Sequence, residues 1–212
     1  MAVKHDGGAT GERFRFDFSG GRLCLDFANT LDDRPTEDRK EQLVDYPDLV
    51  SWARQAGVIG GEEAEALRGT GTRQPAEAQA VLTAARDLRE ALFDIFAAVA
   101  VGDTPLEGSL VTLNAALPEA MSALRVASVE GAFEWRWAGE WRGLDRPLLP
   151  VIRDAAELLT SPELSRVRLC ESETCDWLFF DQSRNRTRRW CDMSTCGNRA
   201  KARRHYERRK HG

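Results

Sequence analysis

Apolar positions along the chain recur mostly at helical intervals. The clearest stretch is 75–101, where apolar residues return every three or four positions, Pro75 stands in the first turn and Gly102 follows the end. This pattern predicts one long helix. Polar residues at 70–74 and the proline at position 118 predict breaks between helices. Further helices are expected over 23–31, 46–55, 62–68, 106–120 and 145–159.

Strand patterns are short. Residues 13–18 alternate strictly between charged residues and Phe, which predicts a half-buried strand. Segments 123–129 and 133–138 lie on either side of Glu130 and Gly131, an arrangement typical of a β-hairpin. Because helices and short antiparallel strands come in blocks, without regular β-α-β alternation, the expected fold class is α+β.

Composition is that of a folded protein outside the membrane. Hydrophobic residues make up 42% of the 212 residues, which is enough to build a packed core. The longest apolar run, 95–101, is far shorter than the roughly 20 residues that a membrane helix needs. Residues 1–12 are polar and Gly-rich without an apolar signal-peptide core, so we expect a flexible tail and a cytoplasmic protein.

The net charge of −4 conceals a strong asymmetry. Residues 181–212 hold 11 Arg or Lys and 3 Asp or Glu, a net charge of +8, whereas residues 1–180 have a net charge of −12. Such a division predicts an acidic body with a basic end, and electrostatic attraction would draw a phosphate-rich partner to that end.

Four of the five cysteines lie close together near the basic end. They form a C-x4-C-x15-C-x4-C pattern, and two close pairs at this separation are typical of a single tetrahedral zinc site. The pattern predicts one structural zinc ion, because four thiolates leave no coordination position for a reacting water. Four reduced, buried cysteines without a metal are the alternative. The predicted zinc ligands are Cys170, Cys175, Cys191 and Cys196.

Cys24 stands apart from this group, in the apolar stretch 23–27. We interpret it as a small buried hydrophobic residue. A reactive redox thiol is the alternative, but no neighbouring base or cation in the sequence supports it.

The basic end reads as a binding surface. Residues 176–181 predict a strand, and residues 186–190 predict an antiparallel return strand that would turn alternate arginines away from Cys191. The residues after Cys196 predict a basic helix in which Ala202 and Tyr206 face the finger. A solvated basic tail is the alternative. Trp177 and Trp190 are expected in the module's core rather than as stacking platforms. Arg199 could instead brace the zinc turn. The predicted nucleic-acid contacts are Arg184, Arg186, Arg188, Arg189, Arg199, Lys201, Arg203, Arg204 and Arg208.

Two segments resemble known families. CDMSTCGNRAK over 191–201, with LFFDQSRNRTRRW before it, closely resembles the CGNR zinc finger, and GRLCLDFANT over 21–30 looks like the signature of the ABATE domain. The resemblance implies a bacterial, cytoplasmic, stress-linked transcription regulator. Its treble-clef-like finger would hold one zinc ion with the four cysteines and would bind DNA. We therefore divide the chain into a tail over 1–12, an ABATE-like α+β domain over 13–163 and a finger over 164–212.

The resemblance also implies that the N-terminal domain could bind a small ligand. Asp26 and Asn29 are its first candidate residues, and a helix cap or a buried hydrogen-bonded pair is the alternative interpretation.

The sequence favours a DNA-binding regulator over three alternatives. An RNA-binding protein would use the same charges and stack Trp177, Trp190 and Tyr206 on unpaired bases. A protein-interaction module would dock its basic helix on an acidic partner. An enzyme is disfavoured because no nucleophile or nucleotide-binding motif is present and the three histidines lie in the tail or at the basic end.

Overall fold

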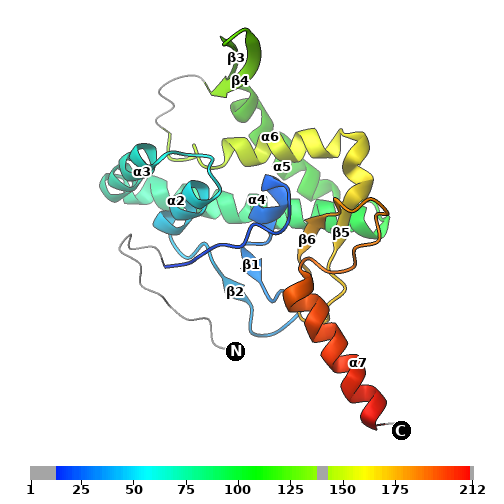
Figure 1. Ribbon diagram of the computed structural model, residues 1–212. Helices are drawn as coiled ribbons and strands as arrows, with labels where there is room; N and C mark the ends of the chain where they lie inside the picture. The colour runs from blue at the N-terminus through cyan, green and yellow to red at the C-terminus, as the bar shows by residue number, and fades with distance from the viewer. Residues whose placement is uncertain (1–12, 138–142, 211–212) are drawn as a thin grey trace.

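The computed structural model describes residues 13–137 and 143–210; the expected tail over 1–12 lies outside them. Most helices form one body, and the last helix extends away from it (Figure 1). No helix in the described ranges is both long and apolar enough to cross a membrane. The helices are α1 (Leu23–Ala28), α2 (Tyr46–Gln55), α3 (Gly61–Arg73), α4 (Pro75–Val101), α5 (Glu107–Ser122), α6 (Leu149–Leu159) and α7 (Asn198–Lys210).

Within the described residues, the strands form two-stranded antiparallel sheets only. The helix-rich body with small antiparallel sheets confirms the α+β class, and a small four-cysteine finger follows it. A 3₁₀ turn, η1 (Pro162–Arg166), leads into the finger. The pairs are β1 (Leu31–Asp32) with β2 (Lys40–Glu41), β3 (Leu124–Val129) with β4 (Ala132–Trp137), and β5 (Val167–Leu169) with β6 (Leu178–Phe180).

Local sequence signals place several elements where they were predicted. Helix α4 begins at Pro75 and ends at Gly102, whose φ of 81° supplies the left-handed C-cap that glycine adopts without strain. Helix α2 begins at a capping box in which Asp45 accepts a hydrogen bond from the Asp48 amide at 3.1 Å. The predicted hairpin forms β3 and β4, which project beyond the helices in Figure 1. Of its predicted second strand, position 138 lies outside the described residues.

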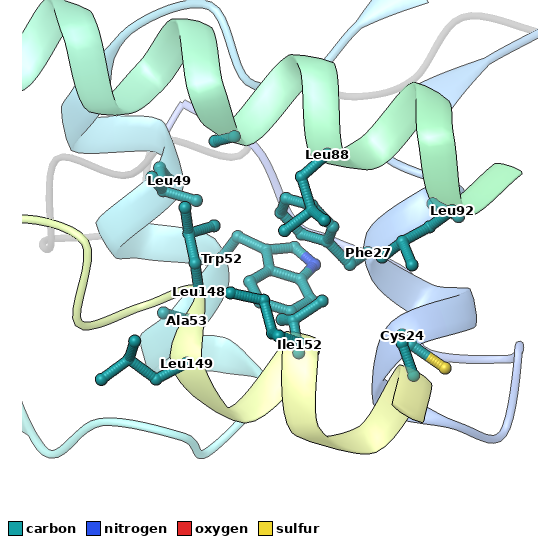
Figure 2. Close-up of a cluster of buried hydrophobic side chains, with 14 of the residues drawn as sticks. Cys24, Phe27, Leu49, Trp52, Ala53, Leu88, Leu92, Leu148, Leu149 and Ile152 are labelled. Atoms are coloured by element: carbon teal, nitrogen blue, oxygen red, sulfur yellow. The ribbon is translucent and has the colours of Figure 1, made fainter. Parts of the chain in front are cut away.

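The body's core is built around Trp52. Its fully buried indole packs edge-on against Phe27, with ring centroids 5.0 Å apart. Figure 2 shows leucine and isoleucine side chains of α2, α4 and α6 gathered around this ring. Four helices therefore meet at one large aromatic residue, and α1, although short, is buried along most of its length.

The predicted strand over 13–18 is wrong as a sheet element but right in its alternation. Phe16 is buried, Phe14 and Phe18 are half-buried, and the charged residues between them are exposed, yet no strand pairs with this segment in the described chain. Instead, the Gln55 side chain accepts from the Phe16 amide at 3.1 Å and donates to the Phe14 carbonyl at 3.0 Å. One amide side chain thus takes the place of a neighbouring strand.

The predicted break over 70–74 narrows to Gln74, between α3 and α4, and the predicted break at Pro118 is wrong. Helix α3 continues to Arg73 because Gly71 lies against the Tyr46 ring, where a Cβ atom would come within 2.8 Å of a ring carbon. Helix α5 runs through Pro118, which lies on its exposed side, where water can satisfy the carbonyl that proline leaves unbonded. Packing of Gly71 against Tyr46 thus allows α3 to continue, and solvent exposure allows α5 to accommodate Pro118.

Strand β6 joins the finger to the body through alternate residues. The Trp177 carbonyl and the Asp181 amide bond toward the β5 side, to the Cys170 amide and the Arg166 carbonyl at 2.9 Å each. The Leu178 amide, the Leu178 carbonyl and the Phe180 amide face the opposite edge, where the body supplies their partners.

Asn29 and Gly20 supply those partners. The Asn29 side-chain amide donates to the Leu178 carbonyl and accepts from the Leu178 amide, both at 2.9 Å. The Phe180 amide donates to the Gly20 carbonyl at 2.7 Å. Farther along, the Trp177 indole donates to Asp32 at 2.8 Å. The finger therefore docks on the body by strand-like hydrogen bonds.

The side chains of β6 divide between two cores. Leu178 and Phe180 belong to the core of the body, whereas Phe179, pointing the other way, packs with the four cysteines. The body's core thus continues across the expected boundary at residue 163.

Replacing Asn29 with Ala should loosen this joint. The change leaves the buried amide and carbonyl of Leu178 without partners, which costs about 2–4 kcal/mol of unfolding free energy. Urea denaturation of the full chain measures it. Asn114→Ala, at an exposed position of α5, is the matched control and should change stability by less than about 0.5 kcal/mol. Equal stability of the two variants would contradict the role of Asn29.

Candidate metal centre and basic surface

The four cysteines of the finger converge from two loops. Cys170 and Cys175 lie in the loop between β5 and β6, and Cys191 and Cys196 lie in the turns before α7. All four are buried, and their Sγ atoms lie within 4.8 Å of one another.

This geometry suits a single zinc ion. The Sγ atoms of Cys175 and Cys191 are 3.6 Å apart, and those of Cys191 and Cys196 are 3.7 Å apart. Tetrahedral coordination with bonds of about 2.3 Å places sulfurs about 3.8 Å from one another. The chain therefore carries a metal-binding cluster fitted to one structural zinc ion, as the spacing predicts.

The proton balance of the cluster also favours a cation. Hydrogen bonds with the Cys170 sulfur raise the pKa of Cys175 and of Cys191, so these thiols resist ionisation when only other sulfurs face them. A divalent cation counteracts this rise in pKa, because it stabilises the thiolate form of every ligand.

Short backbone contacts hold the second cysteine pair. The Asp192 side chain accepts from the Thr195 amide at 2.7 Å and caps η2 (Met193–Gly197), a single wide helical turn. At Gly197 a Cβ atom would come within 2.8 Å of the Met193 sulfur. This glycine therefore fits a tight turn that carries Cys196 into the cluster and leads directly into α7.

Arg188 is part of this framework rather than of a free surface. Its guanidinium donates to the Trp190 carbonyl at 2.8 Å and to the Cys191 carbonyl, and lies 4.8 Å from the Phe179 ring centroid. Its amide donates to Asp181 at 3.0 Å. Arg188 therefore braces the loop between the cysteine pairs.

Sequence reasoning missed Asp181, which is fully buried at the end of β6. Burial raises its pKa, but hydrogen bonds from Ser183 and from the Arg188 amide outweigh this and leave the pKa lowered. An acidic residue directly after three apolar strand residues was the available signal.

The predicted return strand over 186–190 is wrong. Strand β6 pairs with β5 instead, and 186–190 form an irregular loop. Arg184 and Arg186 are exposed on this loop, while Arg188 is half-buried, so the three do not share the outer face of a strand. The positive φ of 52° at Arg186 marks the turn that replaces the strand.

Other predicted basic residues gather around a cleft beside the metal centre. Arg189, Arg199 and Arg203 line a cavity of about 440 Å³ together with Trp190. Arg199 donates to Thr174 across this cleft, toward the first cysteine loop. This bond favours the alternative that Arg199 braces the zinc site, and the side chain also lines the cleft.

The remaining predicted residues lie along α7. Lys201 is exposed, whereas the side chains of Arg204 and Arg208 lie outside the part of the structure that is described. The expected packing of Ala202 and Tyr206 against the finger is wrong: both are exposed, Tyr206 by 70%. Trp177 and Trp190 pack against the cysteine cluster, as expected.

Of the two candidate ligand residues, Asn29 bonds directly to β6, and Asp26 bonds to Gly20, which accepts a hydrogen bond from β6. The amide of Asn29 is used by Leu178, and Asp26 accepts from the Gly20 amide at 2.8 Å. Any ligand of these two groups would have to compete with those bonds. Cys24 is fully buried, and burial raises the pKa of its thiol well above the usual value, as suits an inert core residue.

Replacing Cys175 with Ser should remove zinc and destabilise the whole chain, because Leu178 and Phe180 on the next strand belong to the body's core. Zinc content and thermal melting of the full chain test this. Wild type and Cys24→Ala, the control, should each hold one zinc ion per chain. An unchanged melting temperature in a zinc-free Cys175→Ser protein would contradict the coupling.

Asp26 should make stability depend on pH. Burial, opposed by the Gly20 hydrogen bond, raises its pKa to about 7, so the folded state binds a proton that the unfolded state has released. Stability therefore falls as pH rises through this range, by about 3 kcal/mol between pH 5 and pH 8.

The measurement is urea unfolding of wild type and Asp26→Asn at several pH values. Comparing the two separates Asp26 from the pH dependence of zinc binding. The difference between their unfolding free energies should grow from pH 5 to pH 8 in favour of the variant; a constant difference would contradict the assignment.

Comparisons with known proteins match two consecutive parts of the chain. Residues 21–162 match ABATE, described as "Putative stress-induced transcription regulator", and residues 166–209 match the CGNR zinc finger. A search of curated proteins gave no match. Since the first match covers more than half of the 212 residues and the second contains all four clustered cysteines, the chain belongs to the ABATE family and carries a CGNR zinc finger after its ABATE region.

Proposed function

We propose that the protein is a zinc-dependent, DNA-binding transcription regulator of the cytoplasm, and not an enzyme. The observation that carries the proposal is the direct continuation of the four-cysteine cluster into a basic helix. Cys196 lies in η2, and α7 begins two residues later with five Arg and two Lys among its 13 residues. A helix of this charge is stabilised when phosphates replace its counterions.

Its placement supports contact with a duplex. Helix α7 extends away from the body, opposite the β3–β4 hairpin (Figure 1). Arg199, Lys201, Arg203 and Arg209 are exposed along it. A rigid helix that a metal centre fixes at one end can enter a groove without the loss of conformational freedom that a flexible tail would suffer. Together with Arg184, Arg186 and Arg189 of the finger loops, these residues are the proposed phosphate contacts.

The body would sense a ligand or mediate assembly. The joint at β6 supports a route between an effector and the finger, because Asn29 holds Leu178 directly between the two cysteine pairs. A small molecule that competed for Asn29 or Asp26 would change how firmly β6 is held, and with it the position of the finger.

RNA is the second candidate partner. Tyr206 is 70% exposed on the same helix as the basic residues, and an exposed aromatic ring beside arginines favours stacking on unpaired bases. Preference for single-stranded over duplex probes, in parallel titrations, would support this alternative.

Reversing two charges on α7 tests the DNA proposal. Lys201→Glu with Arg209→Glu should weaken binding of the zinc-loaded full chain to duplexes of any sequence by about tenfold or more, and reduce the slope of log affinity against log salt by about two. Fluorescence anisotropy between about 50 and 200 mM salt measures both.

The control is Arg15→Glu with Arg73→Glu, which changes the net charge equally at exposed positions of the body. Its affinity should stay within about threefold of wild type, since charges beyond the Debye length are largely screened. Equal effects of the two double variants would show that net charge alone acts, and absence of duplex binding by wild type would overturn the proposal.

A further inference from the structure

The cleft beside the metal centre is charge-balanced, although it lies at the basic end of the chain. Three arginines and three glutamates line it, so its side chains carry no net charge. The acidic residues come from the first cysteine loop and from α7. They are Glu171, Glu173 and Glu207.

Each of two cleft arginines is held by a glutamate from the cysteine loop. Arg189 donates to Glu171 at 2.7 Å, and the Glu171 amide donates to the Arg189 carbonyl at 3.0 Å. Arg203 forms an ion pair with Glu173 and donates to Glu207 at 2.9 Å. Because Glu171 and Glu173 lie between Cys170 and Cys175, the same metal loop holds the backbones of both residues beside the arginines.

These pairs are too exposed to be explained by stability. The side chains of Arg203 and Glu173 are 54% and 68% exposed, and those of Arg189 and Glu171 are 56% and 49% exposed. Ion pairs at such exposure contribute little to folding, so the arginines can exchange partners freely. A phosphate would replace a carboxylate as the acceptor.

The exchange nevertheless has a cost for DNA. Once a phosphate takes an arginine, the displaced carboxylate stays near it, because the cysteine loop holds the backbones of Glu171 and Glu173 at the cleft. Like charges so close repel each other even when partly solvated. Every non-specific phosphate contact in the cleft is therefore weaker than the number of arginines suggests.

We propose that Glu171 and Glu173 form a carboxylate mask over Arg189 and Arg203, which weakens non-specific attraction to polyanions and so determines how strongly the finger discriminates among duplexes. The inference rests on the proposed function, that the finger binds DNA. It assigns to the first cysteine loop a part in specificity as well as in metal binding.

The test is Glu171→Gln with Glu173→Gln in the zinc-loaded full chain. Glutamine keeps an acceptor for each arginine and removes the charge. Affinity for a random-sequence duplex at about 100 mM salt should rise about tenfold, and the protein should elute from heparin at higher salt. The control is Glu77→Gln with Glu119→Gln, at exposed positions of α4 and α5, which should change affinity by less than about threefold.

The two probes separate the two claims. The wild type is the masked protein, and the Glu171→Gln, Glu173→Gln variant is the unmasked one. If both have equal duplex affinity and elute from heparin at the same salt concentration, the mask is overturned and DNA binding is left intact. If neither protein binds duplex, the proposed function is overturned, and heparin alone decides the mask: later elution of the unmasked protein alone supports it, and equal elution of unmasked and control proteins overturns it. Equal zinc content and melting temperature show that the finger is unchanged.

Discussion

The open edge of strand β6 is the constraint on which the rest of the finger depends. A three-residue strand with a single partner strand leaves about half of its backbone amides and carbonyls unpaired. Burying these groups without hydrogen-bond partners would cost folding free energy. The Asn29 amide and the Gly20 carbonyl satisfy them from the body. Gly20 is suited to this place because a Cβ atom there would come within 2.6 Å of the Asp26 carboxylate.

Alternation along the same strand then determines where two cores lie. Phe179 faces the cysteine cluster, and Arg188 covers its ring. Leu178 and Phe180 face the body and extend its core. The metal centre is thus backed by a wall that the body holds in place, which is why a finger of this size needs little apolar core of its own.

Much of this could be predicted from the sequence where the cause is local. Pro75 and Gly102 define α4, and the cysteine spacing defines the metal site, since both depend on residues close in the chain. The partner of β6 could not be predicted, because the period of two in a strand does not say which segment lies beside it. The sequence pattern therefore places Arg188 on the surface, whereas in the structure it bonds carbonyls of the finger's own loop.

The roles of Asn29 and Gln55 were equally hidden. Each uses a side-chain amide in place of a strand, and such a contact spans 149 residues in one case and about 40 in the other. Nothing in the local pattern of apolar residues marks it. The cleft is hidden as well: the basic residues are visible in the sequence, but no local pattern indicates which glutamates pair with them.

The shared core also bears on how such a chain can change over evolutionary time. A module that buries its own apolar residues can be moved between proteins by recombination, because it brings its partners along. This finger brings Leu178 and Phe180, whose surroundings are encoded more than a hundred residues earlier and in α4. Separated from its body, it would present an apolar strand edge to solvent and to other chains. The two parts are therefore expected to be inherited as one unit.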